Sequence, residues 1–181
     1  MNRAALLIWL VAFPVSIVSG VLDTPGGPLN LPRMPVDPYK VFANFPNAVA
    51  ISASTNSTNL SCLTAKQLEI DSEAKTTTYL WLFPSVGLEI PFKVKAGEKP
   101  GTMTFTVGND STPMEGIIYY TDEKNCAVAD LEYDGHVCLL WASREVKDSV
   151  PQECIDYFED ICGVTVNQHS RDLCVNGEGD Y

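Results

Sequence analysis

The segments Asn125-Cys126-Ala127-Val128 and Cys138-Leu139-Leu140-Trp141, followed by Cys154, decide the fold of this chain. They place two apolar, strand-like runs next to each other, each with one cysteine. Asp134-Gly135 between the runs favours a β-hairpin, because this dipeptide tolerates the positive φ angles of a tight turn. A helix-like segment with two further cysteines follows. This arrangement is typical of a small secreted barrel whose C-terminal helix is fixed to neighbouring strands by disulfides.

Outward from this hairpin, the chain divides into short β-like runs separated by Asn, Gly, Pro, Asp and Ser. We expect eight strands, at Asn47–Ser54, Leu60–Ile70, Thr76–Phe83, Leu88–Lys95, Thr102–Gly108, Met114–Thr121, Asn125–Tyr133 and His136–Arg144. Several runs alternate apolar and polar residues, which suits one curved sheet around a single interior. The predicted fold class is therefore all-β, an eight-stranded antiparallel up-and-down barrel with a C-terminal α-helix packed outside. A β-sandwich is the alternative.

After Arg144 the spacing of the apolar residues changes from the alternation of a strand to that of a helix, so the sequence predicts a helix here. Ser149 is expected to cap this helix, Pro151 to lie in its first turn and Gly163 to end it. The apolar residues fall on one face at helical spacing, which suits packing against the outside of the barrel. These residues are Cys154, Ile155, Phe158, Ile161 and Cys162. A shorter helical turn is expected at Pro38–Phe45.

The first twenty residues read as an export signal, with a positive Arg3 and an apolar core at Ala4–Ala12. A membrane span is the weaker alternative, because the apolar run is short and Pro14 interrupts it. We therefore divide the chain into four parts. They are a signal peptide at 1–20, an extended Pro/Gly-rich lead-in at 21–38, the barrel with its helix at 39–174 and a flexible tail at 175–181.

Six cysteines follow the signal, and an even number in an exported chain predicts three disulfides. No short-spaced Cys or His pairs suggest a metal site, and we expect no cofactor. The formal net charge of −11 argues against nucleic acid and anionic membranes as partners. Asn56, Asn59 and Asn109 begin glycan acceptor sequences.

An enzyme is not expected. The chain has only two histidines, His136 beside a turn and His169 in the tail, and both are expected to be exposed. With every cysteine paired, no thiol is left as a nucleophile. The sequence also lacks a Gly-rich phosphate loop and the grouping of nucleophile, base and oxyanion donors that acyl transfer needs.

The cysteines predict which side chains face the barrel interior. If Cys126 and Cys138 bond to an external helix, their side chains point outward and their neighbours point inward. Asp130, Glu132 and Asp134 then point outward as well. Adding aromatic candidates from two other strands gives a predicted cavity lining of Ala127, Ala129, Leu131, Tyr133, Val137, Leu139, Trp141, Tyr79, Trp81 and Phe105. These residues either fill the core or, where alanines face large rings, leave a pocket.

Four segments resemble the tick salivary lipocalins of the histamine-binding type, and the resemblance extends from Tyr39 to Cys174. The segments are Tyr119-Tyr120-Thr121, Asn125-Cys126-Ala127-Val128, Cys138-Leu139-Leu140-Trp141 and Val150-Pro151-Gln152-Glu153-Cys154. The resemblance implies a lipocalin barrel, secreted in saliva as a monomer, that binds a small host mediator. It also implies the disulfides Cys62–Cys174 and Cys126–Cys154, which leaves Cys138 for Cys162.

The chain departs from this family at two positions. Where the resemblance places inward acids in amine binders, this sequence has Ala127 and Leu139. A buried ammonium group needs carboxylate partners, and Glu69, Glu89 and Glu115, the other candidates, are expected on the surface. We therefore expect an apolar or amphipathic ligand such as an eicosanoid or fatty acid. Histamine or serotonin is the alternative, and capture of a host defence protein by the outer loops is the second alternative.

Overall fold

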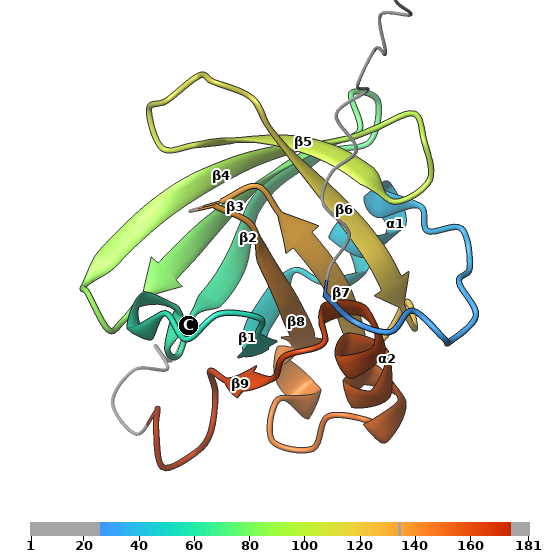
Figure 1. Cartoon of the computed structure of the whole chain (residues 1–181). Coiled ribbons are helices and arrows are strands. Elements are labelled where there is room, and N and C mark those ends of the chain that lie inside the picture. Colours follow the sequence, from blue (N-terminus) through green and yellow to red (C-terminus); the bar gives the residue numbers. More distant parts are fainter. Residues whose placement is uncertain (1–25, 134, 175–181) are drawn as a thin grey trace, which may run out of the picture.

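Eight antiparallel strands close into a barrel in the computed structural model of the protein, which describes residues 26–133 and 135–174 (Figure 1). Each strand pairs with the next along the chain, and β1 pairs with both β2 and β8, which closes the sheet. The strands are β1 (Asn47–Ala53), β2 (Thr64–Asp71), β3 (Thr76–Phe83), β4 (Leu88–Ala96), β5 (Thr102–Val107), β6 (Met114–Thr121), β7 (Cys126–Leu131) and β8 (Val137–Ser143). The predicted all-β barrel is confirmed, and the sandwich alternative is wrong because the strands form one continuous sheet.

The largest difference from the predicted strands is at the start of β2. The 3₁₀-helix η1 (Thr58–Leu60) takes up the beginning of the run at Leu60–Ile70, and β2 starts only at Thr64. Cys62 between them has a positive φ of 60°, and its N–H donates to the carbonyl of Gln168 at 2.8 Å. A two-residue strand, β9 (Val166–Asn167), pairs with β1 and was not predicted, because so short a strand has no periodicity. The 3₁₀-helix η2 (Arg144–Val146) follows β8.

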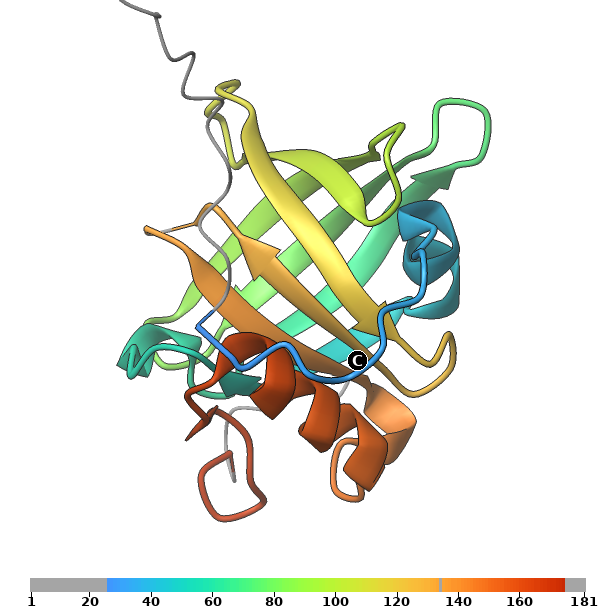
Figure 2. The same ribbon diagram turned by 45° about the vertical axis from the view of Figure 1, so that its right-hand side comes forward.

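Two α-helices lie at different places on the barrel. The helix α1 (Pro38–Asn44) lies at one end of the barrel, and the Asp37 carboxylate caps it by accepting from Tyr39 N–H at 3.0 Å. The helix α2 (Gln152–Cys162) lies outside the wall against β6, β7 and β8 (Figure 2). No helix among residues 26–133 and 135–174 has the length and apolar character to cross a membrane.

The start of α2 corrects one prediction. Ser149 does not cap this helix, because the helix begins only at Gln152; the Ser149 N–H instead closes a turn onto the carbonyl of Val146 at 2.8 Å. Pro151 occupies the N-cap position instead of the first turn, and it offers no side-chain hydrogen bond. Gly163 ends the helix as expected, with a φ of 75° that suits a residue without a Cβ.

The disulfides separate an inner core from an outer one. Cys126 bonds to Cys154 and Cys138 to Cys162, so the side chains of both strand cysteines face α2. Val128, Leu140, Phe158 and Ile161 pack with them between the wall and the helix. The alternate residues of the two strands, including Ala127 and Trp141, belong to the core inside the barrel. The predicted facing of β7 and β8 is therefore confirmed. The third disulfide joins Cys62 to Cys174, so all three pairs are those that the resemblance implies.

The segment at 27–33 binds to α2 and runs across its C-terminal end (Figure 2). The Asp160 carboxylate accepts hydrogen bonds from the backbone N–H groups of Asn30 at 2.7 Å and Leu31 at 3.1 Å. It also pairs with the guanidinium of Arg33 at 2.6 Å. Desolvation acts to raise the pKa of Asp160, but these donors outweigh it and hold the pKa below its usual value. Asp160 therefore stays ionised and anchors the lead-in.

Replacing Asp160 by Asn is expected to lower the thermal midpoint of unfolding at pH 7, because the amide removes the charge that binds Arg33 and the backbone donors. Since the pKa of Asp160 is lowered in the folded protein, its contribution is present above the unfolded pKa and is lost as the pH falls through the folded value. The difference between wild type and Asp160→Asn should therefore shrink toward low pH. Calorimetry over a pH series measures it, with the exposed neighbour change Glu159→Gln as control. Equal midpoints at pH 7 would contradict the role of Asp160.

Candidate ligand-binding cavity

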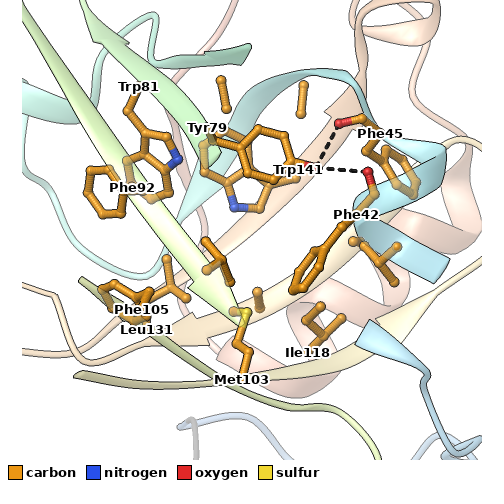
Figure 3. A pocket seen from close by; sticks show the side chains of 16 residues that line it. Phe42, Phe45, Tyr79, Trp81, Phe92, Met103, Phe105, Ile118, Leu131 and Trp141 are labelled. Atoms are coloured by element: carbon orange, nitrogen blue, oxygen red, sulfur yellow. Dashed lines mark hydrogen bonds between the residues drawn. The ribbon is translucent and has the colours of Figure 1, made fainter. Parts of the chain in front are cut away.

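The barrel contains a cavity of about 90 Å³ at the α1 end (Figure 3). No charged residue lines this inner cavity, and its walls are aliphatic and aromatic. The lining comprises Val41, Phe42, Phe45, Ala48, Ala65, Tyr79, Trp81, Phe92, Val94, Met103, Phe105, Ile118, Ala127, Ala129, Leu131 and Trp141. Space exists because the alanines of β7 leave room opposite the large rings of β3 and β4.

The helix α1 lines one end of this cavity, and Tyr79 fixes the helix there. The Tyr79 hydroxyl lies 3.1 Å from the carbonyl oxygen of Phe42 and 3.0 Å from that of Phe45, and these two acceptors share its single proton (Figure 3). Gln67 Nε2 donates to the same Phe42 oxygen at 2.8 Å. Burial strongly raises the pKa of Tyr79, so the phenol stays neutral and keeps its proton for this contact. The carbonyls at the end of α1 are thereby satisfied inside an apolar site.

A second cavity, of about 120 Å³, lies at the other end of the barrel, and we call it the mouth pocket. Its lining mixes polar and apolar side chains from the loop after β1, the turn between β3 and β4, and the turn between β7 and β8. These residues are Thr55, Ser57, Asn59, Leu60, Phe83, Val86, Leu88, Ile90, Tyr133, His136 and Val137. Val86 and Leu88 are 45% and 53% exposed, so the rim carries apolar surface in contact with water.

Four rings lie between the two cavities, and we call them the aromatic partition: Trp81, Phe92, Tyr133 and Trp141. Trp81 stacks on Phe92 with ring centroids 3.9 Å apart, and Trp141 meets Trp81 edge-on at 5.0 Å. Tyr133 lies edge-on to Phe92 at 5.4 Å and to Trp81 at 6.1 Å. Trp81, Phe92 and Trp141 line the inner cavity, whereas Tyr133 lines the mouth pocket. The partition therefore divides the interior into two chambers.

The structure brings seven of the ten predicted cavity residues together around the inner cavity. They are Tyr79, Trp81, Phe105, Ala127, Ala129, Leu131 and Trp141. Tyr133 and Val137 line the mouth pocket instead, because they lie farther along β7 and β8 toward the open end. Leu139 lies between them and Trp141, is fully buried and lines neither chamber.

The sequence prediction missed nine residues of the inner cavity. The alternation of Leu88–Lys95 and Thr102–Gly108 was a usable signal for three of them: Phe92, Val94 and Met103. Val41, Phe42 and Phe45 had no such signal, because their position depends on α1 folding back over the barrel end. Ala48, Ala65 and Ile118 complete the missed set.

The acids near the hairpin do not reach either chamber. Asp130 faces outward as predicted, but it is buried, and His136 Nδ1 lies 3.5 Å from its carboxylate. Burial raises the pKa of Asp130, and the nearby His136 offsets part of this effect. Glu132, like Glu69, Glu89 and Glu115, is exposed. Asp134 lies outside the described residues. No acid of the described chain therefore lines the inner cavity or the mouth pocket.

The two histidines differ in solvent exposure. His136 lines the mouth pocket with about a third of its side chain exposed, as expected (35%). His169 is buried, which corrects the expectation of an exposed residue, and its Nε2 lies 3.6 Å from the Asp148 carboxylate. Its burial follows from the tail, which returns to bond Cys174 to Cys62.

One group of metal-ligand types converges among the described residues, at Asp122, Cys126 and Cys154. Both sulfurs are joined in a disulfide, so they cannot act as thiolate ligands. The Asp122 carboxylate already accepts the N–H groups of Lys124, Asn125 and Cys126. These hydrogen bonds, despite the opposing effect of desolvation, hold the pKa of Asp122 below its usual value. The group therefore stabilises the β6–β7 turn and does not form a metal site.

A family model described as tick histamine binding protein matches residues 49–176, which cover most of the barrel and α2. The chain belongs to the tick histamine-binding protein family. Among solved structures it is similar to AM182 in complex with serotonin, at 15% identity and a TM-score of 0.61, over 77% of this chain and 94% of that one. It is also similar to apocrustacyanin C1, at 17% identity and a TM-score of 0.50, over 81% and 91% of the two chains. At these identities the likeness shows a shared barrel fold. No curated protein sequence matches significantly.

Tyr79→Phe is expected to lower the free energy of unfolding by about 1–2 kcal/mol, because it leaves the buried carbonyl of Phe45 without its donor. Urea denaturation followed by tryptophan fluorescence measures this loss. Tyr39→Phe, on the partly buried face of the same helix, is the matched control and should change stability little. Equal losses in the two variants would show that the Tyr79 hydroxyl does not secure α1.

Proposed function

We propose that this member of the tick histamine-binding family is a secreted carrier that sequesters a small apolar or amphipathic host mediator in its barrel. An eicosanoid or a fatty acid has the required chemistry. The observation that carries the proposal is the lining of the inner cavity, which offers aliphatic and aromatic surface and no charged side chain. Apolar surface removed from water contributes roughly 25 cal/mol per Å², so such a cavity favours a ligand with little polarity.

The size of the chambers sets how such a ligand is held. Pockets for drug-sized ligands typically measure roughly 300 Å³ or more, whereas the inner cavity measures about 90 Å³. A small apolar molecule fits the inner cavity alone, and a long one that fills both chambers requires the aromatic partition to move. The polar head of a long ligand would then lie at the mouth pocket, near Ser57 and His136.

The two positions at which the chain departs from amine binders support this ligand class. Ala127 lines the inner cavity where the resemblance places a carboxylate, and Leu139 is fully buried beside the partition. An ammonium group in the inner cavity would leave its charge without a carboxylate partner, which costs several kcal/mol.

A biogenic amine is the second candidate, and the comparisons favour it more directly than they favour a lipid. The family is described by histamine binding, and the similar AM182 structure contains serotonin. In this chain an amine would be held by the rings of the partition, since Trp and Tyr faces attract cations by roughly 0.5–2 kcal/mol. This contribution is smaller than that of a buried ion pair with good geometry.

Secretion is part of the proposal. Residues 1–20 read as an export signal, and the three disulfides suit an oxidising compartment. The family description is of binding and not of catalysis, which supports the expectation that the chain is not an enzyme.

Titration of the secreted protein with a fatty acid, serotonin and histamine tests the ligand class, because Trp81 and Trp141 report on the inner cavity. We expect saturable quenching by the fatty acid and weak or no response to the amines. Ala129→Leu fills the cavity and should weaken fatty-acid binding by about tenfold or more while the protein stays folded. Ala43→Leu, on the exposed face of α1, is the control. Micromolar binding of histamine or serotonin without fatty-acid binding would establish the amine alternative.

Ala127→Asp is expected to convert the cavity toward amine binding. The new carboxylate lies in an apolar lining and lacks a partner, so the free variant should be less stable than wild type. A cationic ligand supplies that partner, and serotonin should therefore bind the variant about tenfold more tightly than it binds wild type. Thermal unfolding with and without serotonin measures both effects. An unchanged serotonin affinity would show that the missing acid does not determine ligand choice.

A further inference from the structure

The three glycan acceptor sequences gather at one end of the barrel. Asn56 and Asn59 lie in the loop between β1 and β2, and Asn109 lies in the turn between β5 and β6. Both connections are at the end opposite α1, where the mouth pocket opens (Figure 1). All three asparagines are exposed. Of the three, only Asn59 lines the mouth pocket.

The backbone of Asn59 is held firmly at the rim. It lies in η1, and the next residue, Leu60, is buried in the inner core with 4% exposure. Ser85 Oγ donates to the carbonyl of Asn59 at 3.0 Å, which ties this loop to the β3–β4 turn across the pocket. The disulfide of Cys62 with Cys174 secures the same loop three residues after Asn59. A group attached to Asn59 therefore has a fixed root beside the opening.

The surface next to this root is apolar. Val86 and Leu88 lie within three residues after Ser85, and they are among the most exposed large apolar residues of the described chain. Together with Asn59 they line the mouth pocket. N-linked glycans are bulky and hydrophilic, so one rooted at Asn59 would cover this apolar rim and narrow the opening.

We propose that Asn59 is N-glycosylated and that its glycan stands over the mouth pocket, where it shields Val86 and Leu88 and slows ligand exchange. In the modification, Asn59 Nδ2 bonds to the anomeric carbon of a lipid-pyrophosphate-linked oligosaccharide, the amide loses one proton and the lipid pyrophosphate leaves. The effect on exchange rests on the proposed function, whereas the shielding of the rim does not.

Protein secreted from glycosylating eukaryotic cells tests the proposal. Glycopeptide mass spectrometry should find Asn59 occupied. Ser61→Ala removes the acceptor sequence of Asn59 but keeps the asparagine, Thr58→Ala removes that of Asn56, and Asn109→Gln is the control at the same end of the barrel. Enzymatic deglycosylation of the folded wild type provides a second route should Ser61→Ala not be secreted.

Two measurements distinguish the shielding of the rim by the glycan from the effect of the glycan on ligand exchange. Hydroxyl-radical labelling of Val86 and Leu88 should rise on loss of the Asn59 glycan and stay unchanged in Asn109→Gln. Association and dissociation rates of a fatty acid should both rise by about threefold or more, with the equilibrium constant nearly unchanged, as for removal of a lid. An unmodified Asn59, or unchanged labelling and rates after glycan loss, overturns the inference. Increased labelling in a protein that binds no fatty acid supports the shield and contradicts the proposed ligand.

Discussion

The sulfurs of Cys126 and Cys138 point away from the barrel axis because both are bonded to α2, and the rest of the site depends on this direction. Side chains alternate along a strand, so the outward sulfurs force Ala127, Ala129 and Trp141 to the inside. A slip of one residue would exchange the two faces and place the small and aromatic residues against the helix. Both strands are buried on both faces, which makes such a slip costly.

The inner cavity follows from a mismatch in side-chain size together with the helix α1 packed at the barrel end. Alanines on β7 face the rings of β3 and β4, and the protein does not fill the remaining space with a larger residue. The hydrogen bonds of Tyr79 hold α1 across the barrel end, where Val41, Phe42 and Phe45 become part of the apolar lining. The aromatic partition limits access from the other side. An acidic protein therefore holds an apolar chamber bounded by one helix and four rings.

The sequence predicted the features that depend on local pattern. Strand bounds followed from alternation and turn residues, and the inward set on β7 and β8 followed from the cysteines. Features that join distant residues could not be predicted. Asp160 binds Asn30 and Leu31 across most of the chain, and Tyr79 meets Phe42 and Phe45 only after the barrel closes. The burial of Asp130 and His169, and the division into two chambers, likewise depend on what packs over each residue.

The positions of the disulfides give the barrel two unequal halves. All cross-links involve the loop before β2, the strands β7 and β8, α2 and the tail, while no cysteine lies in β3, β4, β5 or β6. Trp81 and Phe92 come from the half that has no disulfide, and Trp141 and Tyr133 are attached to the cross-linked half. A movement of the strands of one half away from those of the other would separate the two ring pairs without breaking a covalent bond. Such a separation of the ring pairs would leave all three cross-links, and the elements that they join, in place.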